Sequence, residues 1–93
     1  MTVGISYSDD IEKAKTVIRN TLRADERVLR DPEPLVVVQA LGESSVDLRV
    51  GPYCSPDDYW GLRFDMLERI KVELDANGLH IPCPQRDVPL FQQ

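Results

Sequence analysis

The sequence predicts an α+β domain of the ferredoxin-like βαββαβ class, in which two helices cover one face of an antiparallel sheet and an extended tail follows. Three observations support this class. Two segments carry apolar residues at helical spacing, two strand-length segments between them are joined by a short turn at residues 42–45, and the last segment is rich in proline. We expect a single domain over residues 1–82 and a tail over residues 83–93.

The first expected strand covers residues 2–7, where apolar residues alternate with small or polar ones. A helix should begin at Ser8 or Asp9, because Asp9 and Glu12 fit a capping box. The apolar stripe of this helix consists of Ile11, Ala14, Val17, Ile18, Thr21 and Leu22.

The middle of the chain should form a β-hairpin. After the helix fades, Val28 and Leu29 should fold back onto the core, since the following prolines exclude further helix. Residues 35–41 are almost continuously apolar and predict a strand that is covered on much of both faces. Apolar residues alternate over residues 46–51, which predicts the half-buried partner strand.

The second helix has a strong start signal, with Ser55 as the expected N-cap and Pro56 at the first helical position. Its predicted core stripe is Trp60, Phe64, Leu67, Ile70 and Leu74. Asn77-Gly78 predicts a left-handed stop, after which Leu79 and Ile81 should form a last short strand.

Composition excludes several classes of protein. The 93 residues include 11 basic and 16 acidic side chains, and the net charge of -5 argues against binding to nucleic acid or to an anionic membrane surface. No apolar run approaches the roughly 20 residues of a membrane-spanning helix. No signal peptide is expected after Met1, and two cysteines are too few for a disulfide framework, so a reducing cytosolic setting is expected.

The residue types that carry chemistry do not form a recognisable site. His80, Cys83 and Cys54 are three soft ligands, but a structural zinc site needs four, usually in close pairs. His80 and Cys83 should point to opposite faces of an extended segment, which disfavours a nucleophile–base pair. The pairs Asp9-Asp10 and Asp57-Asp58 lie at helix starts, where the helix dipole explains them. We therefore expect no catalytic residue, no cofactor and no metal, and hence no enzyme.

An aromatic cluster is the remaining candidate site: Tyr53, Tyr59, Trp60 and Phe64. Such a cluster suits a ligand pocket or a stacking platform, but Trp60 and Phe64 fall in the predicted core stripe, which favours core packing.

Three segments resemble the small-conductance mechanosensitive channel family: "VGISYSDDIEKAKTVI" (3–18), "VVVQALGESSVDLRV" (36–50) and "DYWGLRFDMLERIKVELDANGLHIPCPQRDV" (58–88). The most specific part is the helix that closes on "DANG" and leads into "IPCPQRDV". The resemblance covers nearly the whole chain but only the C-terminal third of a family subunit.

The resemblance implies the cytoplasmic α/β domain of a membrane channel that opens under tension and releases ions and small osmolytes during hypo-osmotic shock. The membrane segments and the pore would lie in N-terminal parts absent from this sequence. Seven copies would enclose a vestibule on the cytoplasmic side of the inner membrane. Each copy would give one strand to a small barrel, and that strand would consist of Arg86, Asp87, Val88, Pro89, Leu90 and Phe91.

The residues leave two alternatives to an assembly domain. One is a ligand-sensing regulatory module of ferredoxin-like fold, and the other is a small enzyme on the same fold. Either would show a specific ligand-dependent thermal shift, because binding to the native state stabilises it.

Overall fold

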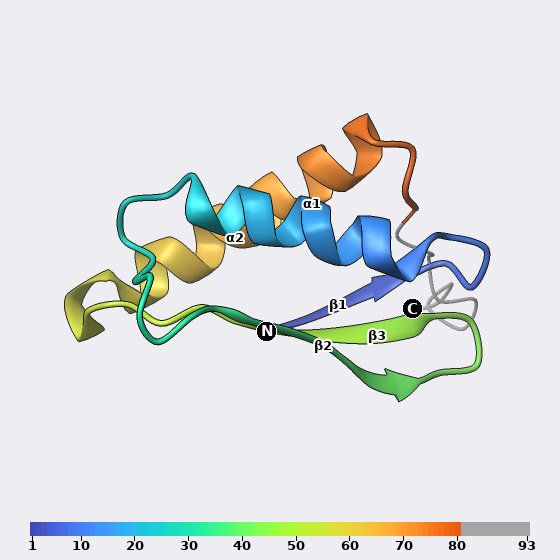
Figure 1. Ribbon diagram of the computed structural model, residues 1–93, viewed down its shortest axis with the longest axis horizontal. Helices are drawn as coiled ribbons and strands as arrows, with labels where there is room; N and C mark the ends of the chain where they lie inside the picture. The colour runs from blue at the N-terminus through green and yellow to red at the C-terminus, as the bar shows by residue number, and fades with distance from the viewer. Residues whose placement is uncertain (81–93) are drawn as a thin grey trace, which may run out of the picture.

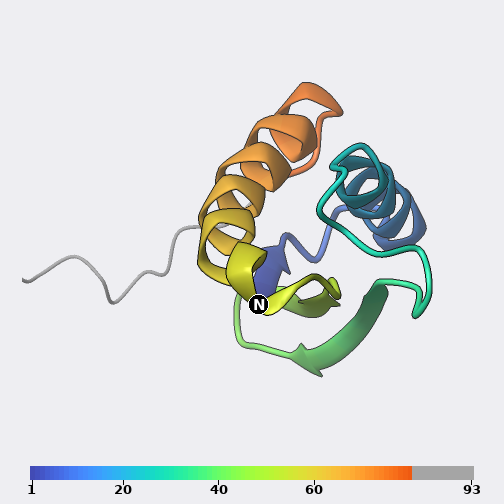
Figure 2. The same cartoon turned by 90° about the vertical axis from the view of Figure 1, so that its left-hand side faces the viewer.

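The computed structural model describes residues 1–80 and shows two helices packed on one face of a three-stranded antiparallel sheet (Figure 1). Figure 2 shows the two layers, with both helices on the same side of the sheet. This confirms the predicted α+β class. The elements, in chain order, are β1 (Thr2–Ile5), α1 (Ile11–Arg23), β2 (Leu35–Leu41), β3 (Val46–Gly51), the short 3-10 helix η1 (Pro56–Asp58) and α2 (Tyr59–Ala76).

The hairpin forms as predicted, but β2 is not covered on both faces. The strand order is β1-β3-β2, so β3 is central and β2 lies at an edge of the three-stranded sheet. Val36 pairs with Val50 and is the only buried residue of β2. The prediction for β2 was wrong because both helices lie on one sheet face, and the nearly continuous apolar run of β2 therefore exceeds the surface available to cover it.

The predicted last strand remains a prediction. Leu79 is buried and the Ser6 amide donates to the His80 carbonyl at 3.0 Å, just beyond the end of β1. Neither Leu79 nor His80 belongs to a strand of the described sheet, and Ile81 lies outside the described residues.

The helix ends differ from the sequence prediction in their caps. Asp10 is the N-cap of α1, because its carboxylate accepts from the Lys13 amide at 3.2 Å; a start at Ser8 or Asp9 was wrong. Ser55 precedes η1 rather than α2 and makes no side-chain capping bond. Gly78 has a φ of 76°, which confirms the left-handed stop after α2.

The core lies between the helices and the inner face of the sheet. The predicted stripe of α1 is confirmed, since Ala14, Ile18, Thr21 and Leu22 are buried, with Ile11 and Val17 packed at its border. Val28 also reaches the core, whereas Leu29 stays exposed. In α2 the buried residues are Leu62, Met66, Ile70 and Leu74. In both helices the buried residues recur four positions apart, and the ridges that they form meet where the two helices pack.

Three residues of the predicted α2 stripe face solvent. Trp60, Phe64 and Leu67 are 62%, 62% and 41% exposed, so only Ile70 and Leu74 were placed correctly. The error has a physical cause. Large apolar residues occupy two overlapping stripes of α2, and helical periodicity favours both of them, but the inner face of the sheet accommodates only one.

A carboxylate joins the segment after α1 to α2. Asp25, whose side chain is 6% exposed, binds the Arg27 guanidinium in a bidentate pair at 2.7 and 3.0 Å, and Arg69 of α2 lies 3.4 Å away. Arg27 also reaches Asp65 of α2 at 2.9 Å. The Arg27 side-chain bonds oppose the effect of burial and, with the Arg69 charge, lower the pKa of Asp25 to about 2.

Shortening a buried side chain of α2 tests which stripe faces the core. Ile70→Ala should lower the free energy of unfolding by about 2–5 kcal/mol, because it leaves a cavity among packed residues. Phe64→Ala is the matched control on the outer face and should change it by under about 0.5 kcal/mol. Denaturant titration at a concentration where the chain is monomeric measures both, and equal losses would contradict the assignment.

The Asp25 network predicts acid-dependent stability. Asp25→Asn should cost about 1.5–3 kcal/mol at neutral pH, as expected for hydrogen bonds to a charged group. Because folding lowers the pKa of Asp25, its contribution is complete above about pH 4 and is lost as pH falls towards about 2. The variant should therefore lose part of this pH dependence in urea unfolding. Asp65→Asn, which removes a half-exposed partner of the same arginine, should cost under about 1 kcal/mol.

Candidate functional site

The predicted assembly strand, Arg86, Asp87, Val88, Pro89, Leu90 and Phe91, lies outside the described residues, and so does Cys83. Of the predicted soft ligands, the structure describes Cys54, which is partly buried against the core, and His80, which follows α2. Within residues 1–80, no three His, Cys, Asp or Glu side chains are grouped so that they would hold a metal ion.

The two acids of the Asp9-Asp10 pair have different roles. Asp10 caps α1, whereas Asp9 binds residue 80. One Asp9 oxygen accepts from the His80 amide at 2.7 Å and from the Ser6 amide at 3.3 Å, and the other lies 3.1 Å from His80 Nδ1. The sequence prediction that the helix dipole explains both acids was therefore wrong for Asp9.

The pKa of Asp9 reflects this position. Its side chain is 6% exposed, and burial raises the pKa, but the hydrogen bonds from His80 and Ser6 and the His80 charge outweigh burial and lower the pKa below its ordinary value. The carboxylate is therefore ionised at neutral pH, and it joins the turn before α1 to a residue 71 positions later.

The aromatic residues of α2 form an exposed surface rather than a core stripe. Tyr59, Trp60 and Phe64, which we call the aromatic face, are each about half exposed or more. The Tyr59 and Trp60 rings meet edge to face with centroids 5.0 Å apart, and Trp60 stacks on Phe64 at 6.0 Å. Leu67 continues the exposed apolar surface one turn further along α2.

A contiguous aromatic surface of this kind is typical of protein–protein contacts. Aromatic side chains are enriched in the buried centres of interfaces, where they contribute most of the binding energy. Isolated exposed apolar residues are ordinary, but an exposed tryptophan ring in contact with two further exposed aromatic rings is not explained by the packing of this domain alone.

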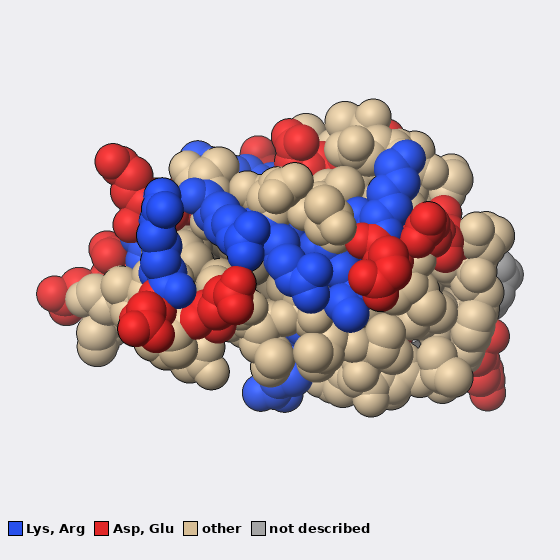
Figure 3. All heavy atoms as spheres, viewed as in Figure 1, with Lys and Arg blue, Asp and Glu red and all other residues tan. Residues whose placement is uncertain are grey.

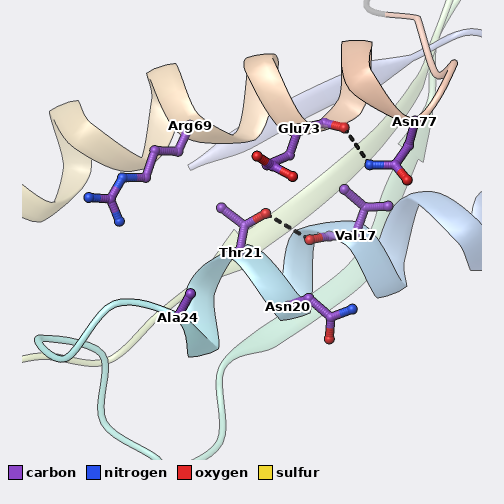
Figure 4. Close-up of a pocket in the computed structure, with 7 residues that line it drawn as sticks. All are labelled: Val17, Asn20, Thr21, Ala24, Arg69, Glu73 and Asn77. Atoms are coloured by element: carbon purple, nitrogen blue, oxygen red, sulfur yellow. Dashed lines mark hydrogen bonds between the residues drawn. The ribbon is translucent and has the colours of Figure 1, made fainter.

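A groove between α1 and α2 is one of the hollows within residues 1–80 that could admit a small ligand (Figure 4). It has a volume of about 400 Å³ and is lined by Val17, Asn20, Thr21, Ala24, Arg69, Glu73 and Asn77. Its polar groups largely bind the protein itself: Thr21 donates to the Val17 carbonyl, Asn77 donates to the Glu73 carbonyl, and Arg69 pairs with Asp25. These contacts are typical of a seam between two helices, and they leave few groups to fix a ligand.

The charged surface is mixed in sign. Figure 3 shows Lys and Arg side chains in a band across the face that carries α1, although the net charge is negative. Two cations of α1 have acidic partners, since Arg23 pairs with Glu33 and Lys15 lies 3.7 Å from Glu12. Partnered cations of this kind do not make the unopposed basic footprint that nucleic-acid binding requires.

Known protein sequences match nearly the whole of this chain. Residues 1–81 match the family described as the mechanosensitive ion channel MscS, C-terminal. An MscS family protein of Archaeoglobus fulgidus is 42% identical over 92% of this chain and 30% of its own length. A small-conductance mechanosensitive channel of Edwardsiella ictaluri is 38% identical over 97% of the chain and 32% of its own length. The chain thus spans about a third of the length of these curated relatives.

Solved structures of related proteins share the fold of this chain. A closed-state MscS of Helicobacter pylori superimposes on the whole chain with a TM-score of 0.85 and 26% identity, over 37% of its own length. Arabidopsis thaliana MSL1 shares the fold over 90% of this chain and 34% of its own, with a TM-score of 0.70 at 14% identity. None of the helices within residues 1–80 is both long and apolar enough to cross a bilayer. The chain belongs to the MscS family of mechanosensitive ion channels, and it corresponds to the C-terminal domain of that family.

Proposed function

We propose that this chain is the cytoplasmic assembly domain of a mechanosensitive channel subunit, in a channel that releases ions and small osmolytes on hypo-osmotic shock. The observation that carries the proposal is the family match over residues 1–81, together with the match to the fold of a channel in its closed state. The domain itself forms no pore in this proposal, and its work is to join subunits.

The proposal assigns two contact regions to the chain. The first is the aromatic face, because desolvating Tyr59, Trp60 and Phe64 against a neighbouring copy would bury their exposed apolar area. The second is the segment Arg86–Phe91, which we propose as one strand of a small barrel made by all copies. Pro89 removes one amide donor from this strand, so each copy contributes one fewer hydrogen bond.

We propose a homo-heptamer on the cytoplasmic side of the inner membrane, attached to the bilayer through segments that precede this chain in the full-length subunit. A ring of identical subunits joins by head-to-tail contacts, in which two unlike surfaces of each copy meet. The proposal includes no enzyme activity and no nucleic-acid partner.

Loss of the aromatic face should weaken the assembly. In the full-length subunit, Trp60→Ala with Phe64→Ala should raise the dissociation constant between subunits by roughly 30-fold or more, because aromatic residues at interface centres contribute about 2 kcal/mol or more. Val72→Ala, at an exposed site on the same helix outside the aromatic face, is the control and should leave assembly unchanged. Native mass spectrometry of detergent-solubilised channel measures the oligomer.

The physiological part of the proposal has its own test. Cells without other tension-gated channels should survive hypo-osmotic shock when they express the full-length subunit, and survival should fall for the double alanine variant but not for Val72→Ala. Survival equal to that of cells without the subunit would contradict the proposed function, provided that the protein is present in the membrane.

A further inference from the structure

Asp9 is a charged, buried side chain that neither the helix cap nor the core explains. Its neighbour Asp10 already caps α1, and 94% of the Asp9 side-chain surface is removed from solvent, since the side chain is 6% exposed. A buried carboxylate is costly unless hydrogen bonds compensate for its lost hydration. The groups that compensate here are the Ser6 amide, the His80 amide and the His80 imidazole.

These contacts hold residue 80 on both sides of its backbone. The His80 amide donates to Asp9 at 2.7 Å, and the His80 carbonyl accepts from the Ser6 amide at 3.0 Å. One residue earlier, the Leu79 amide donates to the Leu74 carbonyl at 2.9 Å, and the Leu79 side chain is buried. The chain is thus anchored at residues 79 and 80, the last residues that the structure describes, and we call the group Ser6, Asp9 and His80 the latch.

We infer that Asp9 is a positioning residue: its carboxylate holds the backbone at His80 and so sets the point and direction from which the chain continues into its last residues. This inference rests on the proposed function, which assigns assembly to the segment Arg86–Phe91. If the segments of seven copies must meet, the backbone at His80 has to occupy the same position in every domain. A fixed backbone position at His80 reduces the conformational entropy that the segment loses on assembly.

The latch depends on the protonation state of the Asp9 carboxylate, and acid weakens it. The His80 imidazole is the titratable side chain that contacts Asp9, while Asp10 binds the amide of Lys13 on α1. Because folding lowers the pKa of Asp9, the carboxylate keeps both backbone donors at neutral and mildly acidic pH. Protonation in stronger acid removes the charge, so the stabilisation is lost as pH falls below the ordinary aspartate range.

Amide hydrogen exchange in the 93-residue chain tests the latch directly. Asp9→Asn should raise exchange at the His80 and Ser6 amides by roughly tenfold or more, since it replaces a charged acceptor with a neutral one. Asp10→Asn removes the same charge one residue away and keeps a good helix cap, so it should leave both amides unchanged. His80→Ala keeps the backbone donor and removes only the imidazole contact, so the amide of residue 80 should stay largely protected.

The assembly role is then measured in the full-length subunit, where Asp9→Asn should lower the fraction of complete oligomers and Asp10→Asn should not. Unchanged exchange at His80 in Asp9→Asn would overturn the latch. Faster exchange with unchanged assembly would overturn the positioning role and leave the proposed function standing. A wild-type subunit that does not assemble would overturn the proposed function and the assembly role together, while the exchange comparison would still decide whether the latch exists.

Discussion

The contact between the two helices and a single face of a three-stranded sheet determines most features of this domain. The inner sides of β1 and β3 contribute Val3, Ile5, Val46, Leu48 and Val50, all buried against the ridges of α1 and α2. A sheet of this size offers one apolar face of limited area. Every further apolar side chain must therefore find another partner or stay in contact with solvent.

The aromatic face is a direct consequence of that limit. α2 has more large apolar residues than one side of a helix can bury, and Leu62 and Met66 occupy the inner positions that Trp60 and Phe64 would otherwise take. The Trp60 ring contacts both Tyr59 and Phe64, so the three rings lie together on the surface. In an oligomer such a surface can be buried against a neighbouring copy, whereas in a permanent monomer it would stay exposed and promote aggregation.

Two buried carboxylates hold the periphery onto this core. Asp25 ties the segment after α1 to α2 through Arg27 and Arg69, and Asp9 ties the turn before α1 to the end of α2 through His80. Both use charged hydrogen bonds where the backbone leaves regular structure, and both have a lowered pKa. These two segments are therefore held by a few strong polar contacts, while the helices and strands are held by apolar burial.

The sequence by itself determined the order of the elements from β1 to α2, the β-hairpin, the inner stripe of α1 and the stop at Gly78, because each depends on local periodicity or on one residue's backbone preference. It also carried the family resemblance in its motifs. Only the tertiary structure decided which stripe of α2 is buried, that β2 lies at an edge, and that Asp9 and Asp25 bind distant partners. These features depend on residues far apart in the chain, and the geometry that brings Asp9 to His80 or Asp25 to Arg69 exists only once the helices have packed on the sheet.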